Sequence, residues 1–167
     1  MEQPRVGLAN IGTEKTKGGP LQLEAYGLME ASSYHFIGNV EARDVPFGAC
    51  DVLVADGFTG NMLLKMYEGV AGAMMANIKG IFKQNAITKL SALMIKNGLM
   101  DFKKRMDYTE FGGAPLLGIS KPVIKAHGSS NAKAFCSAIR QAKQFSETGV
   151  IENIANAVTK SAQASEA

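Results

Sequence analysis

Three segments of this chain combine glycine with hydroxyl or amide side chains at the point where a predicted strand ends. Their sequences are NIGT (residues 10–13), DGFTGN (56–61) and HGSSN (127–131). Glycine lets the backbone approach a ligand closely, and Ser, Thr and Asn side chains donate hydrogen bonds. A following helix N-terminus adds unpaired N–H groups and a partial positive charge. Each segment is therefore a candidate anion-binding turn.

The candidate anion-binding residues are the small or hydrogen-bonding members of these segments: Asn10, Gly12, Thr13, Gly57, Thr59, Gly60, Gly128, Ser129, Ser130 and Asn131. The candidate catalytic residues are polar residues in the last two segments or just before them: Asp56, Asn61, Lys125 and His127. Plain helix capping is the competing interpretation, because the same residue types are the preferred N-caps. A serine hydrolase is disfavoured, because the chain has no G-x-S-x-G elbow.

Several other kinds of site are disfavoured by the spacing of residues. None of the three segments matches G-x-x-x-x-G-K-[ST] or G-x-G-x-x-G, the patterns of the P-loop and the dinucleotide turn. The two histidines and the two cysteines, Cys50 and Cys136, are scattered singly. We therefore expect no metal site, no P-loop or dinucleotide turn and no disulfide framework, and a reducing compartment.

The turns must be positioned by strands and helices, which the apolar pattern predicts. Strands are expected at 6–10, at 34–40 (ended by Gly38 and Asn39) and at 51–56, with two short ones around 118–122, the later of which is VIKA (123–126). Helices are expected from Pro20 to Met29, from Asn61 to Ile81, from Ile87 to Met106, at 130–145 and at 150–158. Apolar strands alternating with helices predict an α/β fold with a mostly parallel sheet, whose strand ends gather ligand-binding turns.

The chain's size suits one domain. With 167 residues, it is long enough to bury a core without disulfides. We expect an α/β domain over 1–160, a helical hairpin inserted over 61–107 and a disordered tail over 161–167. No apolar run reaches the ~18 residues that a membrane-spanning helix needs.

Positive charge is concentrated in the predicted hairpin. Residues 79–105 carry one acidic and seven basic residues, a local formal charge of +6 within a total of +3; the basic ones are Lys79, Lys83, Lys89, Lys96, Lys103, Lys104 and Arg105. A basic, apolar hairpin suits an acidic protein or an anionic membrane surface. The alternative is a solvated helix pair whose apolar stripe packs in a dimer. Nucleic acid is disfavoured, because Phe82 and Phe102 are the only aromatic residues of 79–105.

Five motifs occur in the order seen in the PlsX family of phosphate acyltransferases, and the chain resembles that family over residues 4–155. The motifs are NIGTE (10–14), FIGNVE (36–41), DVLVADGFTGN (51–61), YTEFGGAPLLG (108–118) and KAHGSSNAKA (125–134). The resemblance implies transfer of a fatty acyl group from acyl carrier protein to inorganic phosphate, without cofactor or metal. It also implies a three-layer α/β/α sandwich of the isocitrate/isopropylmalate dehydrogenase type, and a bacterial cytoplasmic homodimer peripherally associated with the membrane.

Family members are about twice as long, so the chain resembles the carboxyl-terminal portion of one. Our hypothesis is that GFTGN and HGSSN cradle phosphate and the oxyanion, with Lys125 adding positive charge. His127 is then the general acid or oxyanion donor, and Asp56 orients a cationic partner. Two alternatives stay open: a truncated, non-catalytic module that binds carrier protein or lipid and dimerises, and a phosphotransacylase acting on short acyl-CoA.

Overall fold

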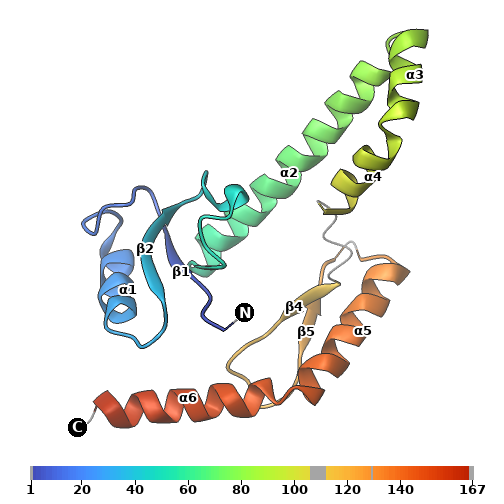
Figure 1. Ribbon diagram of the computed structural model, residues 1–167. Helices are drawn as coiled ribbons and strands as arrows, with labels where there is room; N and C mark the ends of the chain where they lie inside the picture. Colours follow the sequence, from blue (N-terminus) through green and yellow to red (C-terminus); the bar gives the residue numbers. More distant parts are fainter. Residues whose placement is uncertain (1, 106–111, 129, 166–167) are drawn as a thin grey trace. The chain divides into compact units, whose positions relative to one another are not determined.

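Strand β1 (Val6–Asn10) is the central strand of a parallel sheet with the order β2-β1-β3 (Figure 1). Strand β2 spans Phe36–Glu41 and β3 spans Val52–Val54. The computed structural model describes residues 2–105, 112–128 and 130–165, and the sheet belongs to the first of two compact units, Met1–Ala76 and Asn77–Ala167. A continuously apolar strand such as β1 suits this central place, because both of its edges are paired.

The core of the first unit lies between the sheet and helix α1 (Pro20–Glu30). Its buried apolar side chains are Leu8, Ala9, Met29 and Val40. The Tyr26 ring of α1 meets the Phe36 ring of β2 edge to face, with centroids 5.1 Å apart. Helix α1 starts at Pro20 as predicted, since proline at the first helical position lacks only an N–H that would have no helical partner.

The predicted end of the second strand at Gly38 and Asn39 is wrong, because β2 continues to Glu41. Gly38 instead marks an irregularity inside the strand. The pairing with β1 shifts there: Val6 pairs with Phe36 and Gly7 with Gly38. Gly38 has a φ of 94°, a conformation that glycine adopts without a steric penalty. A glycine that resembles a strand end in sequence thus adjusts the register.

The central helices differ from the predicted pair in their bounds. Helix α2 (Gly57–Phe82) starts at Gly57, so the GFTG segment is its first turn. The predicted second helix is divided at Ile95 into α3 (Ala86–Met94) and α4 (Lys96–Arg105). Asn85 caps α3, because its Oδ1 accepts a hydrogen bond from the Thr88 N–H at 2.9 Å. This cap accounts for the polar break that the sequence shows at 83–85.

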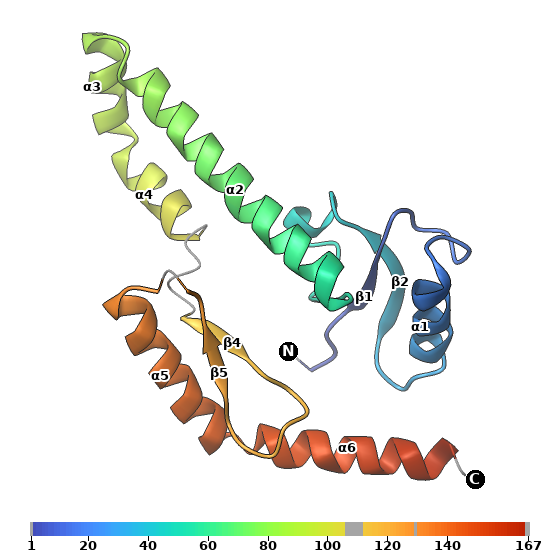
Figure 2. The same ribbon diagram turned by 180° about the vertical axis from the view of Figure 1, so that it is seen from behind.

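Helix α4 runs back along the end of α2 (Figure 1 and Figure 2). Between them lies an apolar groove of about 570 Å³, lined by Ile78, Ile81, Phe82, Ile95, Gly98, Leu99 and Phe102. The helical hairpin, defined from here on as residues 77–105, therefore has an inner apolar surface that its own two arms share.

The second unit also contains a two-stranded antiparallel sheet of β4 (Gly113–Pro115) and β5 (Ile124–Ala126). These strands lie on either side of the segment 118–122, around which strands were predicted, and their antiparallel pairing departs from a mostly parallel sheet. Helix α5 (Ala132–Glu147) packs on both strands through the buried Ala134 and Ala138. Helix α6 (Val150–Ser165) continues through most of the expected tail.

The described residues thus form a mixed α/β structure with a small parallel sheet of three strands and six α-helices. The α/β class predicted from the alternation of strands and helices is confirmed at this level. Among the helices of the described ranges, none is long and apolar enough to cross a membrane.

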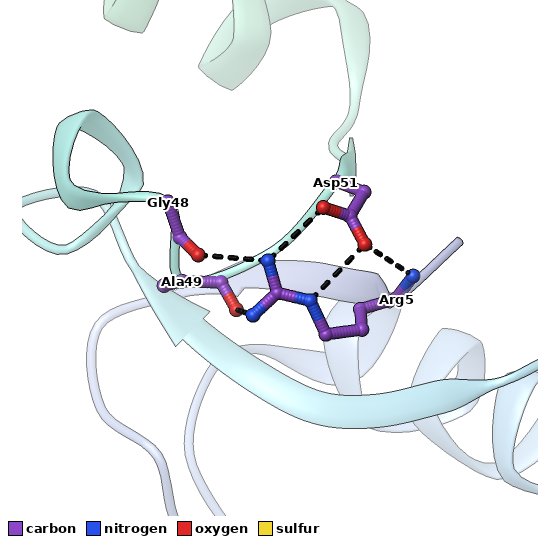
Figure 3. Close-up of polar contacts among 4 residues, drawn as sticks. All are labelled: Arg5, Gly48, Ala49 and Asp51. Carbon is purple, nitrogen blue, oxygen red and sulfur yellow. Dashed lines mark hydrogen bonds and ion pairs between the residues drawn. The ribbon is translucent and has the colours of Figure 1, made fainter. Parts of the chain in front are cut away.

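Arg5 and Asp51 fasten the start of β3 to the start of β1 (Figure 3). The Arg5 Nε and Nη2 atoms donate to the two carboxylate oxygens of Asp51, at 3.0 Å each, and the Arg5 backbone N–H donates to Oδ2 at 2.8 Å. The same guanidinium donates to the carbonyl oxygens of Gly48 at 2.9 Å and Ala49 at 3.2 Å. A two-pronged contact of this kind fixes orientation as well as distance, so it aligns β3 with β1.

We predict that this contact makes stability depend on acid pH. The hydrogen bond from Arg5 lowers the pKa of Asp51 from 3.8 to about 2. A carboxylate with a lowered pKa in the folded state stabilises that state above its ordinary pKa, and the contribution is lost as pH falls through about 2. Asp51→Asn should therefore lower the urea midpoint of the chain at pH 6, and the difference from wild type should vanish near pH 2.

The control is Asp44→Asn, because Asp44 reaches its nearest cation, Arg43 Nε, only at 4.0 Å. That substitution should change the urea midpoint little at either pH. A difference between Asp51→Asn and wild type that is equally large at pH 6 and pH 2 would contradict the assigned role of the ion pair.

Candidate functional site

The carboxyl ends of β1 and β3 lie at one edge of the parallel sheet, where the first two candidate segments begin. A groove of about 320 Å³ is found there, lined by Ala9, Asn10, Ile11, Gly18, Gly19, Gln22, Ala42, Thr59 and Leu63. The structure therefore brings Asn10 of the first segment and Thr59 of the second segment to one concave surface.

The loop between β1 and α1 is held by its own polar groups. We call residues 11–19 the glycine loop. The Asn10 Nδ2 donates to the Lys17 carbonyl at 3.0 Å, and its Oδ1 accepts from the Ile11 N–H at 2.8 Å. Gly12 is buried, and a Cβ there would lie 2.7 Å from the Glu14 Oε2, whereas Thr13 is exposed. The Asn10 amide thus shapes this loop as well as lining the groove.

Asp56 is the N-cap of α2. Its Oδ1 accepts from the N–H groups of Phe58 at 3.0 Å and Thr59 at 2.9 Å, and its Oδ2 accepts from the Thr59 Oγ1 at 2.6 Å. The hydrogen bonds from Thr59 are the largest cause of a lowered pKa for Asp56. The Gly60 N–H bonds to the Asp56 carbonyl at 2.9 Å. The Asp56 carboxylate therefore accepts the hydrogen bonds of the first turn of α2. Helix capping, the competing interpretation of the sequence, is thus the observed role of Asp56.

Asn61 lies on a different side of α2 from the groove. It is exposed and two positions from both Thr59 and Leu63, which line the groove. Two residues turn a helix by about 200°, so the Asn61 side chain leaves the opposite face. No residue of the described ranges shares a hydrogen bond with its amide, which leaves that amide available to a ligand. Gly57 is exposed nearby, at the start of the helix.

The third candidate segment belongs to the second unit and follows β5. The carbonyl oxygen of His127 accepts from the Ser130 N–H at 3.0 Å, and the Asn131 Oδ1 caps α5 by accepting from the Ala134 N–H at 3.0 Å. His127 and Gly128 are exposed, while the Ser130 Oγ is buried and has no partner among the described residues. Asn131 thus has the same capping role as Asp56.

The remaining candidates of the second unit are Lys125, just before this segment, and Ser129, within it. Lys125 is exposed on β5, where it pairs with Ala114 of β4, and the candidate Ser129 lies outside the described residues. In the described part of the chain, no three His, Cys, Asp or Glu side chains are grouped closely enough to hold a metal ion.

The hairpin exposes basic and apolar side chains together. The exposed basic side chains are those of Lys79, Lys83, Lys89, Lys96 and Lys104. Lys103 and Arg105 also belong to α4, but the structure does not describe their side chains. Helix α3 adds exposed Ile87, Leu90, Leu93 and Met94, with Met94 at 83% exposure. These apolar side chains have no covering within the described ranges, which is unusual for residues of this kind in such number.

Seven residues that line the groove were not among the candidates from the sequence: Ala9, Ile11, Gly18, Gly19, Gln22, Ala42 and Leu63. A signal for some of them was present in Gly-Gly-Pro followed by Gln22. The Gln22 Oε1 accepts from the Gly19 N–H at 3.0 Å, which is half of a capping box. Nothing in the local pattern indicates Ala42, which directly follows β2, or Leu63, which lies in α2.

Comparison with known proteins identifies the family. A family model described as "Fatty acid synthesis protein" matches residues 1–153. The phosphate acyltransferase of Lysinibacillus sphaericus is 54% identical over 158 residues, which are 95% of this chain and 48% of the relative. That of Thermoanaerobacter pseudethanolicus is 53% identical over 154 residues (92% and 46%), and that of Brevibacillus brevis is 52% identical over 159 residues (95% and 48%).

These matches leave part of each relative uncovered. The chain spans about half the length of the curated relatives it matches. The match of the family model nevertheless covers nearly all of this chain, and includes all three candidate segments. The chain belongs to the fatty acid synthesis protein (PlsX) family.

Proposed function

We propose that this chain supplies the carboxyl-terminal half of a phosphate acyltransferase, which moves a fatty acyl group from acyl carrier protein to inorganic phosphate. The observation that carries this proposal is identity of 54% over 95% of the chain to a protein with that name. In the reaction, a phosphate oxygen attacks the thioester carbonyl carbon and the C–S bond breaks. The products are acyl phosphate and the thiol of the carrier protein, which takes up a proton.

In this proposal the residues have the following roles. Phosphate lies at the edge of the sheet near Asn10 and Thr13, because the groove and the glycine loop meet there. We assign Asn61, His127 and Lys125 to the acyl thioester and its oxyanion and not to the phosphate in the groove, because Asn61 leaves the opposite face of α2. The phosphate dianion needs positioning more than it needs a base. Asp56 acts by holding the first turn of α2, as its hydrogen bonds support.

The proposal extends to the whole protein. We expect the parallel sheet to belong to a three-layer α/β/α sandwich, completed by residues that the relatives have beyond the matched half. We also expect a cytoplasmic homodimer at the membrane surface, without metal or cofactor. A short-chain acyl-CoA phosphotransacylase is the alternative activity, and comparing rates with acyl-CoA and acyl carrier protein thioesters separates the two.

The activity prediction concerns Asn61→Ala and His127→Ala. The test protein is this chain fused behind the remaining half of the Lysinibacillus relative, assayed for acyl phosphate formation. Each substitution should lower kcat more than tenfold, because loss of a group that stabilises the transition state typically costs about 10²-fold. The urea midpoint of the Asn61→Ala variant should not change, since that side chain is exposed.

Matched controls use the same residue types elsewhere in the chain. Asn77→Ala changes an exposed asparagine of the same helix, and His35→Ala changes the other exposed histidine. Both controls should retain wild-type rates. Wild-type rates for Asn61→Ala and His127→Ala as well would remove these two residues from the site.

A second candidate function is a non-catalytic module that binds an anionic surface, because the hairpin exposes lysines beside uncovered apolar side chains. Each lysine near an anionic membrane contributes about 1 kcal/mol. The double substitution Lys89→Glu, Lys96→Glu should therefore weaken sedimentation of the chain with phosphatidylglycerol vesicles at least tenfold at low salt. Salt should weaken wild-type binding in the same assay.

The control for this experiment is Lys121→Glu, Lys143→Glu, which makes the same change of net charge at exposed sites outside the hairpin. Vesicle binding that ignores both salt and the hairpin substitutions would refute the membrane interpretation. Acidic acyl carrier protein is tested with the same variants, since it offers the hairpin the same negative charge.

A further inference from the structure

We propose that Asn39 is a positioning residue for phosphate binding, which acts by anchoring the glycine loop to the sheet. This inference rests on the proposed function, because it names the residue that holds one wall of the proposed phosphate site. Asn39 lies in β2 beside Leu8 of β1 and is only 6% exposed, so it acts through the loop and not by touching phosphate.

The anchor is a hydrogen bond from a strand to the middle of the loop. The Asn39 Nδ2 donates to the Glu14 carbonyl oxygen at 2.8 Å, across 25 positions of sequence. The Asn10 Nδ2 holds the Lys17 carbonyl at 3.0 Å in the same way. Two carboxamides from adjacent parallel strands therefore hold two backbone carbonyls of one loop.

Simple packing does not account for an asparagine at this position. The Asn39 Oδ1 is buried and has no hydrogen-bond partner in the part of the chain that the structure describes. A buried acceptor without a partner is destabilising, and an apolar side chain of the same size removes that penalty. The favourable interaction of the Asn39 side chain is therefore the hydrogen bond from Nδ2 to the loop. Buried polar groups that lower the stability of a fold are commonly found where function requires them.

The position of the anchor connects it to the site. Glu14 directly follows Thr13, and the two ends of the loop, at Ile11 and at Gly18, line the groove. Gly12 is folded tightly against the Glu14 side chain. Holding the Glu14 carbonyl therefore restrains the backbone through Gly12 and Thr13, which connects the anchored Glu14 to the groove-lining Ile11.

Limited trypsin digestion tests the anchor, because the loop carries two exposed cleavage sites after Lys15 and Lys17. Asn39→Leu removes the donor and the unpartnered acceptor together. Cleavage after these two lysines should become at least tenfold faster. The rate of cleavage elsewhere should stay at the wild-type value, and the urea midpoint should stay at or above it. The matched control is Ser32→Ala, which removes another side-chain donor, from Ser32 Oγ to the Met29 carbonyl at 2.6 Å, at the far end of α1.

Kinetics of the fusion protein test the link to phosphate. Asn39→Leu should raise KM for inorganic phosphate about tenfold with kcat within about twofold, whereas Ser32→Ala should change neither. Unchanged loop cleavage would overturn the anchor, and faster cleavage with an unchanged phosphate KM would overturn the positioning role. A wild-type fusion that makes no acyl phosphate would overturn the proposed function, and with it the role for phosphate, while the digestion still reports on the anchor.

Discussion

The Arg5–Asp51 contact and the parallel pairing that it starts are the constraint on which the first unit depends. Val6, Gly7 and Leu8 pair in register with Val52, Leu53 and Val54, directly after the ion pair. Both strands consequently end at the same edge of the sheet, and the turns that follow them meet in one groove. This alignment brings Asn10 and Thr59 to one surface although they are 49 positions apart in the sequence.

Helix capping and ligand binding use the same residue types. In the structure, the hydrogen bonds of each side chain show which of the candidates cap a helix. The side-chain oxygens of Asp56 and Asn131 accept hydrogen bonds from the first turns of α2 and α5. The Thr13 hydroxyl, in the loop after β1, and the Asn61 amide, on the face of α2 away from the groove, have no hydrogen bonds within the described ranges. The proposed phosphate site is accordingly built from the loop after β1 and from side chains, with the helix N-termini acting mainly as supports. The carboxylate of Asp56 already offsets the positive end of α2.

Features that depend on residues close together in the sequence were predicted, whereas features that depend on contacts between distant residues were not. The β1 strand, the start of α1 at Pro20 and the cap at Asn85 depend on neighbouring residues, and local patterns predicted the strand, the helix start and the helical break. Gly38 was misjudged as a strand end because its role is set by pairing with β1, which sequence alone does not display. The antiparallel pairing of β4 with β5 was missed for the same reason. The hydrogen bond from Asn39 to the glycine loop was not predicted, because its acceptor, the Glu14 carbonyl, is a backbone group.

The central claim is that the edge of the sheet in the first unit binds phosphate. Titration of the ¹⁵N-labelled chain with inorganic phosphate, followed by amide chemical shifts at constant ionic strength, tests it most directly. The account predicts saturable shifts at Gly12, Thr13 and Thr59, with none of comparable size on the basic helical hairpin. Shifts confined to the hairpin lysines, or no saturable shift at the glycine loop, would contradict it.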